Sequence, residues 1–316
     1  MIRVGLGTSW FGFDEGRQTA EHEADGSLQP AMADRVDAAL PRHPALQSTI
    51  EELWERRAEL GLNDTDALAS VTEAIDLLDK GEARVAEIVD DEVVVHAWLK
   101  QAILLLFRLR SMETIEVGPF EYADKLPLKK GYQAAGVRAV PGASARWGSY
   151  LERDVILMPS YVNIGARVGS GSMVDTWATV GSCAQVGRNV HLSGGVGIGG
   201  VLEPPQASPV IIEDEAMIGS RCMIVEGARV GEGSVVGPGV ILTKTIPVID
   251  VETGEEIDRG RIPSWCVAVS GTRKRQFAGG EFGMPAVLII KRLEEGKRHD
   301  KAQLNDALRD VGLSLG

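Results

Sequence analysis

Aliphatic residues recur at every sixth position through the central part of the chain. The members are Ile156, Val162, Val168, Val174, Val180, Val186, Leu192 and Ile198, and then Ile212, Ile218, Ile224, Val230, Val236 and Leu242. A small or β-branched residue stands two positions before all but the first, and Gly often follows. This period is typical of a parallel β-helix, in which each hexad gives one short strand and one corner of a triangular prism. We therefore expect a β-helix over residues 140–270 with these aliphatic side chains inside.

The count is broken in two places. Ile198 and Ile212 are fourteen positions apart, which is two more than two hexads, and Gly199–Pro209 lies between them. A second insertion at Ile249–Gly260 contains the turn-like Glu252-Thr253-Gly254. Loops that project from a rigid scaffold are common sites of function.

The segment before the repeats has helical periodicity. The spacing predicts a helix over residues 46–60 that ends at Gly61, and further helices over Asp66–Asp79 and Trp98–Arg110. Residues 83–95 read as a hairpin with a turn at Asp90-Asp91, and Gly118–Pro141 as irregular.

The chain is thereby divided into four parts. Residues 1–44, rich in Gly, Asp, Glu and Pro, are expected to be a poorly ordered extension. Residues 45–139 form an N-terminal helical domain and residues 140–270 the β-helix. Residues 271–316 form a small C-terminal segment with a strand at Ala286–Lys291 and a helix at Lys301–Val311. The fold class is mainly β.

Composition narrows the function. The formal net charge of -12 over 316 residues argues against nucleic-acid and membrane-surface partners. The apolar run Ala102–Phe107 is far shorter than the ~20 residues of a membrane-spanning helix, and no cleavable leader is evident. We expect a cytoplasmic protein. Cys183, Cys222 and Cys266 are too scattered for a disulfide framework and are expected to be structural.

Specific motifs lie between Leu157 and Pro204. They include Met-Val-Asp-Thr-Trp at 173–177 and Asn-Val-His-Leu-Ser-Gly-Gly-Val-Gly-Ile-Gly-Gly at 189–200. From about Pro44 to Gly271 the chain resembles the tetrahydrodipicolinate N-succinyltransferases of bacterial lysine and diaminopimelate biosynthesis. The resemblance implies a left-handed β-helix and a homotrimer with active sites in clefts between neighbouring β-helices. It also implies succinyl transfer from succinyl-CoA to the amine of 2-amino-6-oxopimelate, the ring-opened hydrate of tetrahydrodipicolinate, with no metal and no permanently bound cofactor.

The resemblance assigns roles to two residues, and a third is a further candidate. Asp175 stands at a corner position where other hexads have Gly, and it matches the family's substrate-binding aspartate and favoured general base. By itself, a carboxylate there is also compatible with a corner cap that accepts a backbone N–H. Arg138 matches the family's substrate-binding arginine, and Arg221 is the next candidate for the second carboxylate of the substrate.

Further candidates are less specific. His191 is the one histidine of the repeat region, and it either lines the ligand site or acts as a base, as in many hexapeptide acetyltransferases. Glu203 on the excursion loop and Glu226 are additional carboxylates. Some relatives have a catalytic Glu where this chain has Met223, so that role is either absent here or transferred to a neighbour such as Glu226.

Coenzyme A needs both an oxyanion site and a phosphate site. Backbone amides at Gly194–Gly197, including Gly195 and Gly197, could stabilise the thioester oxyanion because bare glycine backbone permits close approach. Arg273, Lys274 and Arg275 follow the last coil and are candidates for the phosphates, although a solvated turn explains them equally well.

Three other functions remain in view. One is an acetyl-CoA-dependent acyltransferase that uses His191 as its base. A metal-dependent carbonic anhydrase needs several histidines, yet His22, His43, His96 and His299 all lie outside the repeat. A non-catalytic solenoid would need neither the excursion loop nor a charged corner.

Overall fold

The computed structural model describes residues 42–296 together with Arg309 and Gly312. The expected extension, up to residue 41, lies outside the described residues. So does the expected helix Lys301–Val311, apart from Arg309. The described residues belong to one compact unit, Ala39–Gly316.

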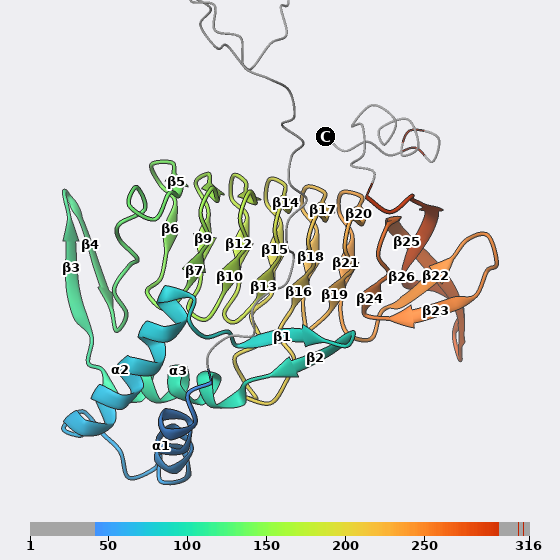
Figure 1. Ribbon diagram of the computed structural model, residues 1–316. Coiled ribbons are helices and arrows are strands. Elements are labelled where there is room, and N and C mark those ends of the chain that lie inside the picture. The colour runs from blue at the N-terminus through green and yellow to red at the C-terminus, as the bar shows by residue number, and fades with distance from the viewer. Residues whose placement is uncertain (1–41, 297–308, 310–311, 313–316) are drawn as a thin grey trace, which may run out of the picture. The chain divides into compact units, whose positions relative to one another are not determined.

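The N-terminal part contains three helices and a hairpin, as expected (Figure 1). The elements are α1 (Pro44–Glu55), α2 (Thr65–Lys80), β1 (Ala86–Val89), β2 (Glu92–Val95) and α3 (Ala97–Leu109). Gly81 ends α2 in the left-handed conformation, at a φ of 74°. Helix α1 ends at Glu55, before the predicted stop at Gly61, and Leu60 still packs into the apolar core between the helices.

The expectation of irregular structure from Gly118 onward was wrong at its start. Strands β3 (Glu113–Val117) and β4 (Phe120–Asp124) pair antiparallel around Gly118, which adopts a φ of 57°. Most side chains of both strands are exposed, so the inside-outside alternation that signals a strand is lacking.

The central part is a left-handed parallel β-helix with three faces. The first face consists of β5 (Arg138–Ala139), β8 (Ile156–Leu157), β11 (Met173–Val174), β14 (His191–Leu192), β17 (Met217–Ile218) and β20 (Val235–Val236). The second face consists of β6 (Ser144–Ala145), β9 (Tyr161–Val162), β12 (Thr179–Val180), β15 (Gly197–Ile198), β18 (Met223–Ile224) and β21 (Ile241–Leu242). The third face consists of β7 (Tyr150–Leu151), β10 (Arg167–Val168), β13 (Gln185–Val186), β16 (Ile211–Ile212), β19 (Arg229–Val230) and β24 (Arg261–Ile262).

The second residue of each two-residue strand points into the prism. The interior column contains Val162, Val174 and Leu192, all fully buried, which confirms the direction predicted for the repeat. The prediction for Ile156 was wrong: Leu157 is the buried residue, and Ile156 lies on the outer surface. Because Leu157 and Val162 are five positions apart, one corner is a residue shorter than the others.

The β-helix also begins earlier than residue 140. Ala145, Leu151 and Leu157 continue the six-residue spacing backward to Ala139 on β5. Arg138 is therefore on the first strand of the first face, whereas we had attributed it to the preceding domain.

Beyond the last coils, the chain forms two hairpins that join the first face. The expected insertion at 249–260 is the hairpin β22 (Pro247–Asp250) and β23 (Glu256–Arg259). The strand expected at Ala286–Lys291 lies within β26 (Gly280–Arg292), which pairs antiparallel with β25 (Cys266–Phe277). Strand β25 runs without interruption across the expected boundary at residue 270.

The helical domain packs against the corner between the second and third faces. Ile164 and Cys183 at this corner join the core of the helices, and Ile103 of α3 lies over Gly165. The excursion between β15 and β16 lies here too, because Lys100 of α3 donates a 2.6 Å hydrogen bond to the carbonyl of Ala207.

Candidate active site

The corner between the first and second faces brings three predicted site residues onto successive coils. We call it the first corner, and it carries Asp175, Gly195 and Arg221. The amide of Gly195 donates to the carbonyl of Thr176 at 2.9 Å, and the amide of Arg221 donates to the carbonyl of Gly194 at 3.1 Å. These bonds stack the three turns, so Asp175 and Arg221 lie two coils apart with a glycine between them.

Gly195 makes room for Arg221. Both residues occupy the left-handed position of their turns, with φ values of 70° and 63°. A Cβ on Gly195 would lie 2.9 Å from Cδ of Arg221, inside van der Waals contact. The arginine side chain therefore lies over Gly195. Gly195 is on the coil next to that of Asp175.

Asp175 begins the turn that follows β11. Its Oδ1 accepts the amide of Thr176 at 2.6 Å and the Thr176 hydroxyl at 3.2 Å. The corner-cap interpretation is therefore correct for one oxygen. The other oxygen, Oδ2, lies 3.5 Å from Nε2 of His191 on β14. About a third of each of these two side chains is exposed, so one carboxylate oxygen remains accessible beside an imidazole.

The sequence indicates both members of this pair as candidates but does not place them together. Met173 and His191 are directly paired across β11 and β14, one coil apart. Asp175 follows Met173 by two positions, where the chain turns and its side chain can lean toward the next strand. The eighteen-residue spacing of the coils predicts that Met173 and His191 are neighbours, and this would have placed Asp175 close to His191.

Arg138 lies on the same face, on the exposed end strand β5. Two strand spacings separate β5 from β11, or about 10 Å at ~4.8 Å per spacing. Arg138 therefore lies on the same face as the strand that precedes Asp175, two strands away.

Glu203 and Glu226 are not at the first corner. Glu226 follows β18 at the corner between the second and third faces, and Glu203 is on the excursion between β15 and β16. Both leave the second face at the end opposite Asp175, and both are exposed. Within one chain the structure does not bring them together with Asp175, so a role for Glu226 in place of a carboxylate at Met223 stays a prediction.

The expected oxyanion donors at Gly194–Gly197 are largely occupied. The amide of Gly195 donates to Thr176, that of Val196 to Ser193 at 3.2 Å, and that of Gly197 to Cys222 at 2.8 Å. The hypothesis is wrong for these three amides, because Gly195 and Gly197 donate to neighbouring coils and Val196 donates within its own turn. In this run, the Gly194 amide alone shows no backbone acceptor.

The outer surface of the second face is apolar near the first corner. Met223 covers Gly197 so closely that a Cβ on the glycine would lie 2.5 Å from the sulfur. Trp177, Met223 and Ile241 are 75%, 43% and 54% exposed. None of the outward residues on this face, which runs from β6 to β21, is a carboxylate.

The basic run Arg273–Arg275 lies on the long strand β25 rather than on a turn after the last coil. Arg273 forms an ion pair with Glu256, and Lys274 lies 2.9 Å from Glu281. Arg275 lies over the ring of Phe277 at 5.4 Å. All three side chains thus already have partners within these hairpins.

The buried thiols have the character of core residues. Burial raises the pKa of Cys183 to about 12 and that of Cys222 and Cys266 to about 11, so these thiols stay protonated near neutral pH. Over residues 42–296 there is no group of three or more His, Cys, Asp or Glu residues able to hold a metal ion. Among the described helices, none is long and apolar enough to span a bilayer.

Comparison with known proteins places the chain in a family. Residues 45–109 match the family model described as tetrahydrodipicolinate N-succinyltransferase N-terminal, and residues 209–244 match the hexapeptide repeat of succinyl-transferase. An N-acyltransferase from Bacillus cereus, solved with dTDP and coenzyme A, aligns with a TM-score of 0.32 and 13% identity over 57% of this chain and 94% of that chain.

Two curated relatives are much more similar in sequence. The 2,3,4,5-tetrahydropyridine-2,6-dicarboxylate N-succinyltransferase of Dechloromonas aromatica is 47% identical over 274 residues, covering 84% of this chain and 99% of that protein. The enzyme of the same name from Acinetobacter baylyi is 49% identical over 272 residues, covering 84% and 98%. With this identity along nearly the whole length of the relatives, the chain belongs to the tetrahydrodipicolinate N-succinyltransferase family of acyltransferases.

Proposed function

We propose that this protein transfers the succinyl group of succinyl-CoA to the amine of 2-amino-6-oxopimelate, the hydrated form of tetrahydrodipicolinate. This is the succinylase branch of diaminopimelate and lysine biosynthesis. The observation that carries the proposal is the match to N-succinyltransferases along 98–99% of their length. An accessible Asp175 between arginines of the first face and the first corner supports it.

In this mechanism Asp175 is the general base. The neutral amine attacks the thioester carbonyl, the C–N bond forms, and Oδ2 of Asp175 takes the proton that the nitrogen loses. Collapse of the tetrahedral intermediate breaks the C–S bond, and the thiolate takes a proton to leave as free CoA. A positioned base of this kind contributes ~10²–10⁴ in rate.

Two arginines are proposed to bind the acceptor's carboxylates. Arg221 is held over Gly195 on the corner of Asp175, and Arg138 lies on the end strand of the first face. A guanidinium suits this task because it offers paired donors in a fixed plane. Within one copy Glu203 and Glu226 leave the second face at its other end, away from Asp175, and the proposed chemistry uses neither.

Succinyl-CoA is a cosubstrate here, and no other cofactor is proposed. Its pantetheine is proposed to pass along the first corner at Gly195 and over Gly197 and Met223. Its phosphates are proposed to meet Arg273, Lys274 and Arg275 by displacing Glu256 and Glu281. We further propose a homotrimer in which the exposed Trp177, Met223 and Ile241 face a second copy, and a cytoplasmic location, where CoA thioesters are available.

The decisive assay offers the purified protein succinyl-CoA and acetyl-CoA in parallel with tetrahydrodipicolinate and follows CoA release. We expect turnover with succinyl-CoA, and equal or exclusive use of acetyl-CoA would refute the succinyl assignment. Asp175→Asn should lower kcat by at least ~10²-fold. Asp154→Asn, at a different corner, serves as the matched control and should keep normal turnover.

The second candidate is an acetyl-CoA-dependent acyltransferase in which His191 is the base. The 3.5 Å approach of its Nε2 to Asp175 is the observation that favours it, because a carboxylate beside an imidazole can orient the ring. The parallel assay with acetyl-CoA separates the two functions.

A further inference from the structure

The two oxygens of Asp175 have different surroundings. Oδ1 accepts two hydrogen bonds from Thr176, one from its amide and one from its hydroxyl. Oδ2 has no comparable bond, and its neighbour is Nε2 of His191 at 3.5 Å. A carboxylate held at one oxygen can still tilt as a plane about that oxygen, so a second bond at Oδ2 would fix its orientation.

His191 offers the matching atom. Its Nε2 is buried and has no hydrogen-bond partner, although a third of the whole side chain is exposed. In the ladder of the first face, the neighbours of His191 are Met173 and Met217, whose thioethers are weak acceptors. The charged groups placed at this corner are Asp175 and Arg221. A buried imidazole N–H is costly without an acceptor, and Oδ2 is the carboxylate within reach.

We infer that His191 is a positioning residue: its Nε2–H donates to Oδ2 of Asp175 and fixes that oxygen for proton transfer. The inference rests on the proposed function in that it takes Asp175 as the base. A carboxylate oxygen has two lone pairs, so Oδ2 can accept from His191 on one and take the amine proton on the other. No proton needs to leave the imidazole.

A pair of substitutions tests this directly. His191→Gln keeps an amide N–H at about the reach of Nε2, whereas His191→Asn is one methylene shorter and cannot bridge to Oδ2. The Asn variant should lower kcat by roughly 10- to 100-fold, as for a misplaced catalytic group, with KM for both substrates changed less than about threefold. The Gln variant should restore kcat to within about fivefold of the wild type and keep the shape of the pH–rate profile.

Each other result overturns the inference. Equal losses in the Gln and Asn variants, with the acid limb of the pH–rate profile removed in both, would make the imidazole itself the base. Wild-type kcat in both would mean that His191 has no role. In the double variant Asp175→Asn/His191→Asn, the losses should not add, because the two residues act as one unit. Full additivity would contradict the inference.

Two measures separate this inference from the proposed function. The wild-type protein is assayed first, and absence of succinyl transfer refutes the function alone. Crystal structures of the two variants then test the inference without turnover: Oδ2 should keep its place in the Gln variant and move in the Asn variant. The matched control is His96→Gln, since His96 also pairs with a carboxylate, Glu87 at 2.9 Å, but away from the first corner. It should leave kcat unchanged.

Discussion

Two glycines of the first corner have the same backbone conformation in different surroundings. Gly195 and Gly239 have φ values of 70° and 73°, but a Cβ on Gly195 would strike Arg221, whereas one on Gly239 would meet open space. Alanine at either position should cost ~1–2 kcal/mol of unfolding free energy. Gly195→Ala should in addition raise KM for the acceptor by roughly 10-fold or more, because Arg221 must move and a charge-assisted bond is worth ~1.5–3 kcal/mol.

Denaturant unfolding and steady-state kinetics on both variants measure these effects. Gly239→Ala is the control, since it carries the backbone strain without the clash. A similar rise in KM in both variants would show that Arg221 does not bind the acceptor.

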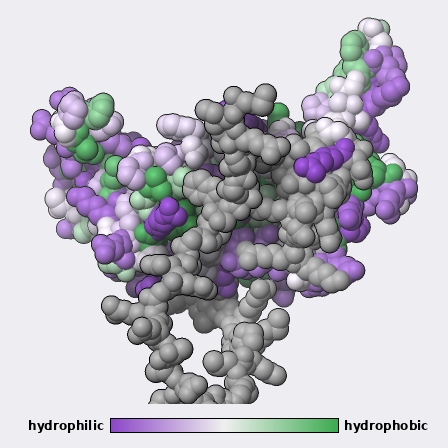
Figure 2. Space-filling model, turned by 90° about the horizontal axis from the view of Figure 1, so that it is seen from above, coloured by the Kyte–Doolittle hydropathy of each residue, from purple (hydrophilic) through white to green (hydrophobic). Residues whose placement is uncertain are grey.

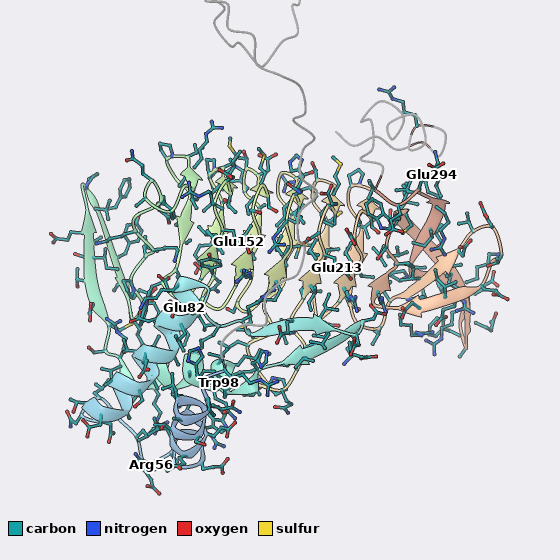
Figure 3. All side chains as sticks on the ribbon, in the orientation of Figure 1. Arg56, Glu82, Trp98, Glu152, Glu213 and Glu294 are labelled. Atoms are coloured by element: carbon teal, nitrogen blue, oxygen red, sulfur yellow. The ribbon has the colours of Figure 1, made fainter. Side chains whose placement is uncertain are left out.

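Glu152 predicts a pH-dependent stability. Burial alone would raise the pKa of Glu152, but Arg167, the amide of Ser170 and Arg188 together hold it below its usual value. Figure 3 labels Glu152 and Glu213, which follow strands of the third face. Because the pKa is lower in the folded chain than in the unfolded chain, the stabilisation is present above ~pH 4.3 and is lost as pH falls through the folded-state value.

Glu152→Gln should therefore lower the unfolding free energy at pH 7 by about 1–3 kcal/mol, since Arg167 is left without its carboxylate. The difference from the wild type should shrink below ~pH 4. Urea unfolding at several pH values measures it, with Glu116→Gln on the exposed strand β3 as the control. A constant difference across the pH range would contradict the assigned pKa direction.

At the scale of elements, the β1–β2 hairpin is held to the third face through its turn. Arg229 donates to both the carbonyl and the carboxylate of Asp91, and Arg261 donates twice to the same carboxylate. Hydrogen bonds from Arg261 and Arg229 lower the pKa of Asp91. The attachment of the hairpin is therefore fully present at pH values above the usual aspartate pKa, and it is lost as pH falls through the lowered pKa.

Asp91→Asn keeps the left-handed turn but removes the charge, and it should raise hydrogen exchange of the β1–β2 amides several-fold at neutral pH. The wild type should begin to loosen as pH falls below the usual aspartate value of ~3.9 and show the same loosening once pH is below the lowered pKa of Asp91. Exchange measured by mass spectrometry tests this, and Asp90→Asn at the adjacent turn position is the control. Unchanged exchange in the Asp91 variant would show that the hairpin is held by other contacts.

The elements that the sequence predicted are those with a buried stripe. Six-residue periodicity located the strands from β9 to β21 because each inward residue is enclosed by coils on both sides. Strands β3 and β4 were missed because their side chains stay exposed. The inward position at Leu157 was missed because Ile156 and Leu157 are both aliphatic. A corner shortened by one residue therefore leaves an aliphatic residue at the position where the six-residue spacing predicts one.

For the molecule as a whole, the repeat predicts the scaffold more completely than the site. The site depends on which corners lie together, and this follows from register across coils rather than from the local sequence. Asp175 and Arg221 lie on the same corner two coils apart, whereas Glu226 leaves the second face at its other end. Figure 2 shows hydrophobic and hydrophilic residues intermixed over the coloured part of one surface, so hydropathy alone does not mark a site on this side of the chain.

Exposed apolar residues on the second face predict where copies of the chain assemble. Ile241 is 54% exposed on the second face, in line with Met223 on the neighbouring strand β18. Exposed apolar residues in a row mark contact surfaces. If this face meets a second copy in the proposed trimer, Ile241→Asp should reduce the mass measured by light scattering toward the 33.9 kDa chain, and kcat should fall with it. Leu62→Asp, similarly exposed at 59% between α1 and α2, should keep the assembled mass.

A fully assembled and active Ile241→Asp protein would exclude this face from the interface, whereas loss of assembly in both variants would point to general destabilisation.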